Sequence, residues 1–437
     1  MIGPATAELP VTSAPAPGGD GASLPRLLAG PPASRDPQQA LADHLRTHGW
    51  LRLDADPAAL THEVAAAGLT GRGGAAFPSA RKLAAVCAAA NAVVVGNGAE
   101  GEPTSRKDTA LLWHAPHLVL DGLQLVAAAT GAGTALLCVH ARRTGLRVHL
   151  EKALSVRGDT VAVQLVETPP RFLAGEESGL VSHLNGGAGM PAFKEHRVSE
   201  RGVGGRPTLV QNVETLAHIA LIARHGAAWF RAAGTRDEPG SLLCTVTETD
   251  GSTRIVETAA GTPLARLLHL DDSVQAVLAG GYHGGWLSAA QASTLGLSNT
   301  YLKPAGAFVG AGVLAALPAA RCGLAETASV ARYLALESAG QCGPCLNGLP
   351  RIAAALGAIA RPGPARAELG NLVRWAGLLP GRGACHHPDG TARLVASALR
   401  VFAAEIDEHA RGRCTAGTTA PFLPVPAAGT GPPADWR

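Results

Sequence analysis

Three cysteines with the spacing of metal ligands are the strongest chemical signal in this sequence. Cys342 and Cys345 form a Cys-x-x-Cys turn, which brings two thiolates close enough to bind one metal centre. Cys385 lies further along the chain, within Gly-Ala-Cys-His-His, and would be a third ligand that only the fold can supply. An iron–sulfur cluster usually has four thiolate ligands. The position three residues before Cys342 holds Ala339, so the sequence predicts a cluster site that lacks one cysteine.

The residues alone leave other chemistry open at these cysteines. A Cys-x-x-Cys pair can be a redox dithiol, but that interpretation needs a βαβ context, and this region has a helical pattern. Zinc is a stronger alternative, because the three cysteines together with His386 or His387 would complete a four-ligand site.

A glycine-rich segment upstream is suited to phosphate binding. Gly71, Gly73 and Gly74 open a helix, where exposed backbone N–H groups can bind an anion, and Lys82 adds a positive charge one turn further on. Its match to the dinucleotide-binding fingerprint is weak, because a helix rather than a strand precedes it. A tight turn with a helix cap is the simpler alternative.

Three further segments combine polar and acidic residues with the ends of apolar strands. Such loops are typical of a cofactor crevice at the carboxyl edge of a sheet, where carboxylates and amides can bind hydroxyl groups. Alone, each is equally consistent with solvated loop charges or helix caps. The candidate residues are Asn97, Glu100, Glu102, Gly175, Glu176, Glu177, Asn212 and Thr215.

Sequence periodicity predicts an α+β protein with several domains. Helical and strand patterns alternate over residues 60–235, which favours an α/β layer. Residues 240–317 contain a hairpin around Asp250-Gly251 and suggest a β-grasp module. Four helices follow over residues 322–412. The tails are rich in Pro, Ala and Gly without a hydrophobic period. We therefore predict a disordered tail (1–37), an α/β domain (38–238), a β-grasp module (239–318), a helical domain that carries the three cysteines (319–414) and a second disordered tail (415–437).

Composition excludes several classes of protein. The formal net charge is +3 and there is no basic run, so nothing suggests nucleic-acid binding. No secretory signal is visible, and the longest apolar stretch, residues 122–139, is interrupted by glycines, so we expect no membrane insertion. Eight scattered cysteines in a long chain argue against a disulfide framework. These features predict a cytoplasmic protein.

These segments occur in the same order in one known family. The chain resembles the flavin-bearing, NADH-oxidising subunit of respiratory complex I and related subunits of NAD-linked hydrogenases and formate dehydrogenases, over roughly residues 60–412. The resemblance implies that the α/β domain binds flavin and that the helical domain holds an iron–sulfur cluster. It implies FMN contacts from the glycine loop, Lys82, Asn97, Glu100, Gly175, Glu176, Asn212 and Thr215. It implies that Glu102, Glu177 and Phe77 face the nicotinamide cofactor, and that Cys342, Cys345 and Cys385 are three of the four ligands of a [4Fe-4S] cluster.

The sequence also departs from the family pattern. Ala99 replaces an aspartate, Leu83 replaces a tryptophan, and Arg197, in the segment 194–197, replaces an aromatic residue. An aromatic contact contributes about 0.5–1.5 kcal/mol beyond burial, so the NADH face is weakened more than the flavin loops. At Ala339 we favour a [4Fe-4S] cluster with a replacement ligand over [3Fe-4S] or zinc. The candidate replacements are His386, His387, Cys322 and Cys414.

The resemblance implies an NADH dehydrogenase-like oxidoreductase. Electrons would pass from NAD(P)H through FMN to the cluster, and then to a partner such as a ferredoxin or a membrane-bound reductase subunit. The competing hypothesis is a degenerate, non-enzymatic paralogue that acts as a docking or ligand-binding module, with zinc in place of the cluster.

Overall fold

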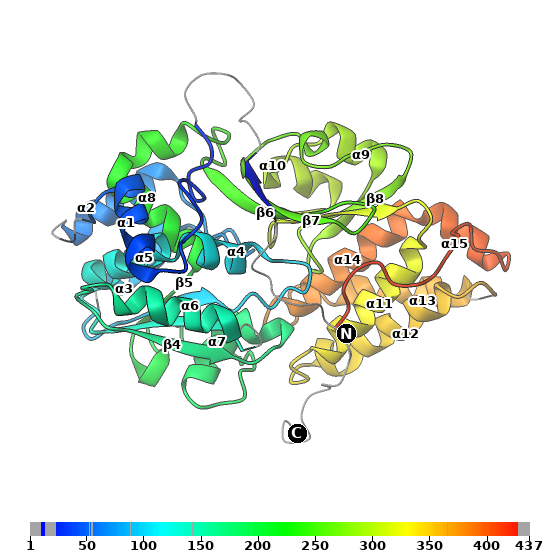
Figure 1. Cartoon of the computed structure of the whole chain (residues 1–437). Helices are drawn as coiled ribbons and strands as arrows, with labels where there is room; N and C mark the ends of the chain where they lie inside the picture. Colours follow the sequence, from blue (N-terminus) through cyan, green and yellow to red (C-terminus); the bar gives the residue numbers. More distant parts are fainter. Residues whose placement is uncertain are drawn as a thin grey trace.

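The structure is a computed structural model that describes residues 10–13 and 23–426, apart from residues 52, 54, 55, 88, 142, 143, 194 and 365. It is a mixed α/β structure with two sheets and a group of C-terminal helices (Figure 1). Lys194, at the start of the segment where an aromatic residue is replaced, lies outside the described residues, as do residues 1–9, 14–22 and 427–437 of the tails. Within the described residues, no helix is both long enough and apolar enough to cross a membrane.

The first sheet is a four-stranded parallel sheet. Its strands are β2 (Val93–Gly98), β3 (Thr134–His140), β4 (Val163–Thr168) and β5 (Thr208–Asn212), in the order β4-β3-β2-β5. The central strand β2 has Val93, Val94 and Val95 buried, as expected for a parallel strand that is covered on both faces.

Eight helices accompany this sheet: α1 (Pro37–His48), α2 (Pro57–Ala67), α3 (Ser79–Cys87), α4 (Lys107–His114), α5 (Pro116–Thr130), α6 (Thr144–Ser155), α7 (Glu177–Leu184) and α8 (Val213–Arg231). Helices α5 and α8 pack so closely that a Cβ at Gly122 would lie 2.0 Å from the carbonyl oxygen of Leu216. The pattern over 108–129 predicts one helix, but the structure has two. Pro116 has no N–H to continue the first helix and instead begins the second.

The second sheet has six strands: β1 (Val11–Ser13), β6 (Ser241–Thr247), β7 (Thr253–Ala259), β8 (Val274–Ala279), β9 (Gly285–Ser288) and β10 (Val313–Pro318). Their order is β1-β7-β6-β10-β8-β9. The predicted hairpin joins β6 to β7, with Gly251 at a φ of +84° that favours glycine. The sequence pattern over residues 262–268, after Gly261, predicts a short helix, but the structure has only a 3₁₀ turn at Leu264–Arg266. Helices α9 (Ala289–Thr294) and α10 (Asn299–Leu302) lie beside this sheet (Figure 1).

Five helices form the C-terminal part: α11 (Gly323–Leu336), α12 (Leu349–Ile359), α13 (Arg366–Leu378), α14 (His387–Val401) and α15 (Ala403–Ala410). Figure 1 shows them in yellow to red beneath the second sheet. The predicted helix over 390–409 is broken at Phe402, whose φ and ψ of −103° and 27° leave the helical region.

Parts of both predicted disordered tails are ordered, so that prediction is wrong for the described residues within them. Strand β1 pairs in parallel with β7, and Leu27 is fully buried. The backbone N–H groups of residues 26–28 donate to the buried carboxylate of Glu257 at 2.9–3.0 Å. At the other end, Leu423 is buried and its N–H donates to Glu326. Composition averages over a tail and overlooks short apolar segments with partners far away in the sequence.

Candidate functional site

The order of the first sheet creates a crevice between β2 and β5. The chain leaves β2 towards β3 and β4 on one side and later returns to β5 on the other side. When the chain leaves two neighbouring parallel strands in opposite directions, a crevice opens at the carboxyl ends of those strands. This crevice is where α/β proteins bind ligands. Asn97 and Asn212 are register partners at this edge.

The two asparagines hold the loops at this edge together. Asn212 Nδ2 donates to Asn97 O at 3.2 Å and to Asp108 Oδ2 at 2.7 Å, and its Oδ1 accepts from the N–H of Glu214 at the start of α8. Asn97 Nδ2 donates to the carbonyl of Gly175 at 2.9 Å. The structure therefore brings together three segments that lie far apart in the sequence.

The glycine loop packs on the same edge. The N–H of Arg72 donates to Thr215 Oγ1 at 2.9 Å, and Gly71 N donates to Phe77 O at 2.8 Å, which closes the loop. A Cβ at Gly73 would lie 3.4 Å from Asn212 Cβ. Gly74 has a φ of +107°, which strains any residue with a side chain. Backbone conformation therefore favours glycine at Gly74, whereas a Cβ at Gly73 would only make an ordinary contact with Asn212.

Observations at this edge fit the phosphate and polar groups of a flavin nucleotide. Lys82 lies on α3 beside the loop, and Gln211 Nε2 is buried without a hydrogen-bond partner in the described part of the chain. Only three non-glycine residues of that part have a positive φ, and two of them, Ala76 and Glu100, belong to the loops at this edge. Unpaired buried donors and strained backbone are common where a ligand completes a site.

The candidate glutamates form two pairs along the chain, Glu100 with Glu102 and Glu176 with Glu177, and the two members of each pair have different roles. The first member of each pair caps a helix: Glu100 accepts from the N–H groups of Asp108 and Thr109, at 2.9 and 3.1 Å, and Glu176 accepts from those of residues 178 and 179, at 2.8 and 3.0 Å. The second member bonds to another segment. Lys82 Nζ lies 2.6 Å from Glu177 Oε1.

Glu102, the second member of the first pair, connects the first sheet's loop to the second sheet. Its Oε2 accepts from the N–H of Tyr282 at 2.8 Å, and its Oε1 accepts from Thr104 Oγ1 at 2.6 Å. Burial raises the pKa of this carboxyl, although these hydrogen bonds oppose the rise. A Cβ at Gly281 would lie 2.6 Å from Glu102 Oε2, so glycine lets the turn before Tyr282 approach.

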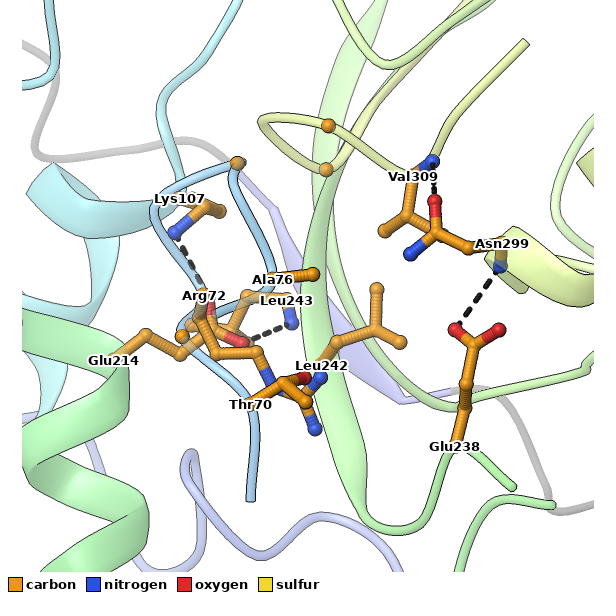
Figure 2. Close-up of a pocket in the computed structure, with 14 residues that line it drawn as sticks. Thr70, Arg72, Ala76, Lys107, Glu214, Glu238, Leu242, Leu243, Asn299 and Val309 are labelled. Carbon is orange, nitrogen blue, oxygen red and sulfur yellow. Dashed lines mark hydrogen bonds and ion pairs between the residues drawn. The ribbon is translucent and has the colours of Figure 1, made fainter. Parts of the chain in front are cut away.

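A small cavity lies between the glycine loop and the second sheet. Figure 2 shows Arg72, Lys107 and Glu214 on one side of it, and Asn299 and Val309 on the other. Its volume of about 30 Å³ suits a water molecule rather than a flavin. Gly71 and Gly74 also line it, so the cavity borders the glycine loop that packs on this edge of the sheet.

The three predicted cluster cysteines come together at the end of α11. Cys345 lies in a π-helical turn, Pro344–Gly348, while Cys385 precedes α14. Burial, together with the adjacent thiols of Cys342 and Cys385, raises the pKa of Cys345 to about 12. Cys345 and Cys385 are buried and Cys342 is half-buried, and three neighbouring thiols suit a cationic iron centre.

Ala339 and the two histidine candidates differ in what each could offer as a fourth cluster ligand. Ala339 is buried against Leu173 and Met190 and offers no ligand atom. Both ring nitrogens of His387 are engaged, Nδ1 with His283 at 2.9 Å and Nε2 with Leu334 O at 2.8 Å. The side chain of His386 is 97% exposed and pairs with Asp389. Neither Ala339 nor His387 therefore provides a free ligand atom, and only one ring nitrogen of His386, Nδ1, is paired among the residues that the structure describes.

Cys322 and Cys414 are excluded as cluster ligands by distance. Cys322 caps the start of α11, whereas Cys342 follows its end, and a helix of that length spans about 20 Å. Cys414 lies next to Cys322. In the structure these two candidates neighbour each other, while Cys345 has Cys342 and Cys385 as its neighbouring thiols.

Comparisons with known proteins match two separate parts of the chain, one that contains the glycine loop and one that contains the three cysteines. Residues 64–221 match the Nuo51 FMN-binding domain, and residues 325–409 match the NADH-ubiquinone oxidoreductase-F iron-sulfur binding region. The F subunit of NADH-quinone oxidoreductase from Rickettsia bellii is 25% identical over 373 residues, which cover 80% of this chain and 89% of the relative. The F 2 subunit of the Rhizobium meliloti enzyme is 27% identical over 367 residues, which cover 79% of this chain and 87% of the relative.

Solved structures show the same likeness. The NAD⁺-reducing [NiFe]-hydrogenase matches with a TM-score of 0.72 and 30% identity in its H₂-reduced state, over 81% of this chain and 62% of the hydrogenase chain. In the air-oxidized state the TM-score is 0.75 at 28% identity, over 85% and 65%. This chain thus spans less than two thirds of the hydrogenase chain. It carries an FMN-binding domain and a 4Fe-4S binding region, and it is a divergent homologue of the F subunit of NADH-quinone oxidoreductase and of the NAD⁺-reducing hydrogenase subunit.

Proposed function

We propose that this protein is an NADH dehydrogenase-like oxidoreductase that passes electrons from NADH through FMN to an iron–sulfur cluster and on to a partner protein. The observation that carries the proposal is the convergence of the glycine loop, Lys82 and the ends of β2 and β5 on one edge of the parallel sheet. The matched FMN-binding and iron–sulfur regions support it. When bound, FMN accepts a pair of electrons and releases them singly to the cluster.

For the flavin, we propose that backbone N–H groups of Gly73 and Gly74, together with Lys82, bind the phosphate, while Gly71 holds the loop closed through its bond to Phe77 O. Asn97, Gly175, Asn212 and Thr215 fix the loops that line the crevice. Glu100 and Glu176 keep these loops in place by capping α4 and α7.

For the nicotinamide donor, we propose that Glu177 and Phe77 lie on the face that receives it. The Phe77 ring is 42% exposed and is available for stacking, with Arg81 above it at 5.3 Å. Glu102 orients this face through its bond to Tyr282.

We propose three units: a flavin-binding α/β domain, a β-grasp module formed by the second sheet, and a helical iron–sulfur domain. The first and third lie in contact, because Phe172 N, just before Gly175, donates to Glu337 Oε2 at 3.0 Å near the cluster cysteines. Such contact favours electron transfer over a short path. A ferredoxin or a membrane-bound reductase subunit would accept the electrons, and a reducing cytoplasm suits eight free thiols.

The test is anaerobic purification followed by quantification of flavin, iron and sulfide, and then by titration with NADH. Bound FMN, about three to four irons per chain and reduction of the flavin by NADH are the expected results. A colourless protein without flavin would overturn the proposal and favour the non-enzymatic paralogue, for which the alanine at Ala339 is the specific observation. Yellow protein that contains zinc but no iron at Cys342, Cys345 and Cys385 would exclude the electron-transfer role.

A further inference from the structure

Four potential metal ligands meet at the end of α11 that is opposite the cluster cysteines. The ligand atoms of Cys322, Glu405, His409 and Cys414 all lie within 4.8 Å of one another. The first three residues are buried and Cys414 is half-buried. Both cysteines lie outside the matched iron–sulfur region, residues 325–409. This group therefore belongs to neither the flavin crevice nor the cluster loop.

The group joins three separate segments. Cys322 follows β10 and is the last residue before α11. Glu405 and His409 are four residues apart on α15 and so share one face of that helix. Cys414 lies in the C-terminal segment beyond α15, and its thiol is hydrogen-bonded to both Cys322 and Glu405.

Hydrogen bonds outside the group orient two of these side chains. His409 Nδ1 lies 3.0 Å from the carbonyl oxygen of Ile359, which makes this nitrogen the donor and turns the Nε2 lone pair towards the group. Glu405 Oε1 accepts from the N–H of Thr415 at 2.9 Å, and its other oxygen accepts from the hydroxyl of the same residue. A fixed imidazole and a fixed carboxylate are characteristic of metal sites.

The arrangement brings electron-rich atoms together. His409 Nε2 lies 3.0 Å from Glu405 Oε1 and 3.7 Å from Cys322 Sγ. At 3.0 Å, Nε2 and the carboxylate oxygen share a proton in the metal-free site, and a bound cation would take the place of that proton. The two thiols can each lose a proton to become ligands.

We propose that Cys322, Glu405, His409 and Cys414 bind one structural Zn²⁺ ion. Two sulfurs, one imidazole nitrogen and one carboxylate oxygen form the closed four-ligand set that suits zinc, whereas calcium and magnesium prefer oxygen ligands. The four ligand atoms lie within 4.8 Å of one another, a separation that suits one ion rather than a cluster with several irons. The ion would fasten α15 and the C-terminal segment to the junction between the second sheet and α11.

The first experiment measures zinc in the full-length protein, purified without added metal, by mass spectrometry and by X-ray absorption at the zinc edge. We expect about one zinc per chain, with two sulfur ligands near 2.3 Å and two nitrogen or oxygen ligands near 2.0–2.2 Å. The double variant Cys322→Ser/Cys414→Ser should lose the zinc while keeping its iron and flavin. Its C-terminal segment should be cleaved faster by protease.

Two control variants separate this site from other thiols. Cys87→Ser removes a free cysteine on α3 and should keep the zinc, and Cys345→Ser should lose iron but keep the zinc. Three results would each overturn the proposal. They are an unmodified protein that contains no zinc, a double variant that keeps its zinc, and a mass deficit of two hydrogens that reveals a Cys322–Cys414 disulfide. Loss of iron in the double variant would do the same. If the double variant does not fold, the zinc-edge spectrum of the unmodified protein decides.

Discussion

The ammonium nitrogen of Lys107 lies 2.8 Å from Glu214 Oε2, with 4% and 1% of the two side chains exposed. Lys107 also lies 2.6 Å from Asp108 Oδ1, and Glu214 Oε1 accepts from the N–H of Leu243 on β6 at 3.0 Å. Figure 2 shows the lysine and Glu214 beside the small cavity. One buried charge pair therefore connects α4, α8 and the second sheet.

Replacing Lys107 by Met should destabilise the protein strongly. It leaves two buried carboxylates without their cation, and breaking such a pair costs about 3–5 kcal/mol. The measurement is the midpoint of denaturant unfolding. Arg147→Met is the matched control, because Arg147 pairs with Glu151 at the surface, where a pair contributes about 0–1 kcal/mol. Equal effects of the two substitutions would contradict the assigned role of Lys107.

The carboxyl of Asp121 should make the free energy of unfolding depend on pH in the acid range. Burial alone would raise the pKa of its carboxyl, but the hydrogen bond and charge of His44, with Arg157 and Arg224, hold the pKa well below its ordinary value. A lowered folded-state pKa means that the stabilisation is fully present above the unfolded-state pKa of about 4 and is lost as the pH falls below it. Asp121→Asn should therefore flatten the acid branch of the stability curve, whereas the surface variant Glu151→Gln should leave it unchanged.

Lys82 should discriminate between FMN and riboflavin. If its ammonium group binds the flavin phosphate, Lys82→Ala weakens FMN binding by about tenfold or more, since a charged hydrogen bond contributes about 1.5–3 kcal/mol. Riboflavin, which lacks the phosphate, should bind equally well to both forms. Fluorescence titration of the flavin-free protein measures both affinities, with Lys152→Ala as the control. Parallel losses for both ligands would assign Lys82 to its ion pair with Glu177 instead.

Ala339→Cys should restore the fourth thiolate. Ala339 lies on the loop of the other cluster cysteines, and a cysteine there supplies the usual fourth ligand. The variant should hold about four irons per chain and should lose them more slowly in air. Ala354→Cys, on the exposed face of α12, is the control. Unchanged iron content and unchanged loss in air would show that the wild-type site needs no cysteine at this position.

Local patterns predicted most of the elements, while long-range contacts were out of reach. The apolar pattern over residues 134–140 predicts a strand with the bounds of β3, and the predicted hairpin is present, because such patterns and turn residues act over a few positions. The pairing of β1 with β7, by contrast, joins residues more than 200 positions apart. A short, exposed strand carries no signal of its partner.

The candidate site shows the same contrast. Sequence placed Asn97 and Asn212 after apolar strands, but only the pairing of β2 with β5 makes them neighbours. The caps formed by Glu100 and Glu176 follow from acidic residues before a helix, an alternative already visible in the sequence. The meeting of Cys322 with Cys414 has no local signal, because the whole helical region separates them.

The bond between Arg26 and Glu257 has a consequence for synthesis of the chain. The two residues are 231 positions apart, so the N-terminal segment emerges long before the carboxylate that receives its N–H groups. At about 5–20 residues per second, translation of the intervening chain takes on the order of 10–50 seconds. Throughout this interval the backbone N–H groups of residues 26–28 lack the carboxylate that receives them, and the segment can close onto β7 only after the second sheet has begun to form.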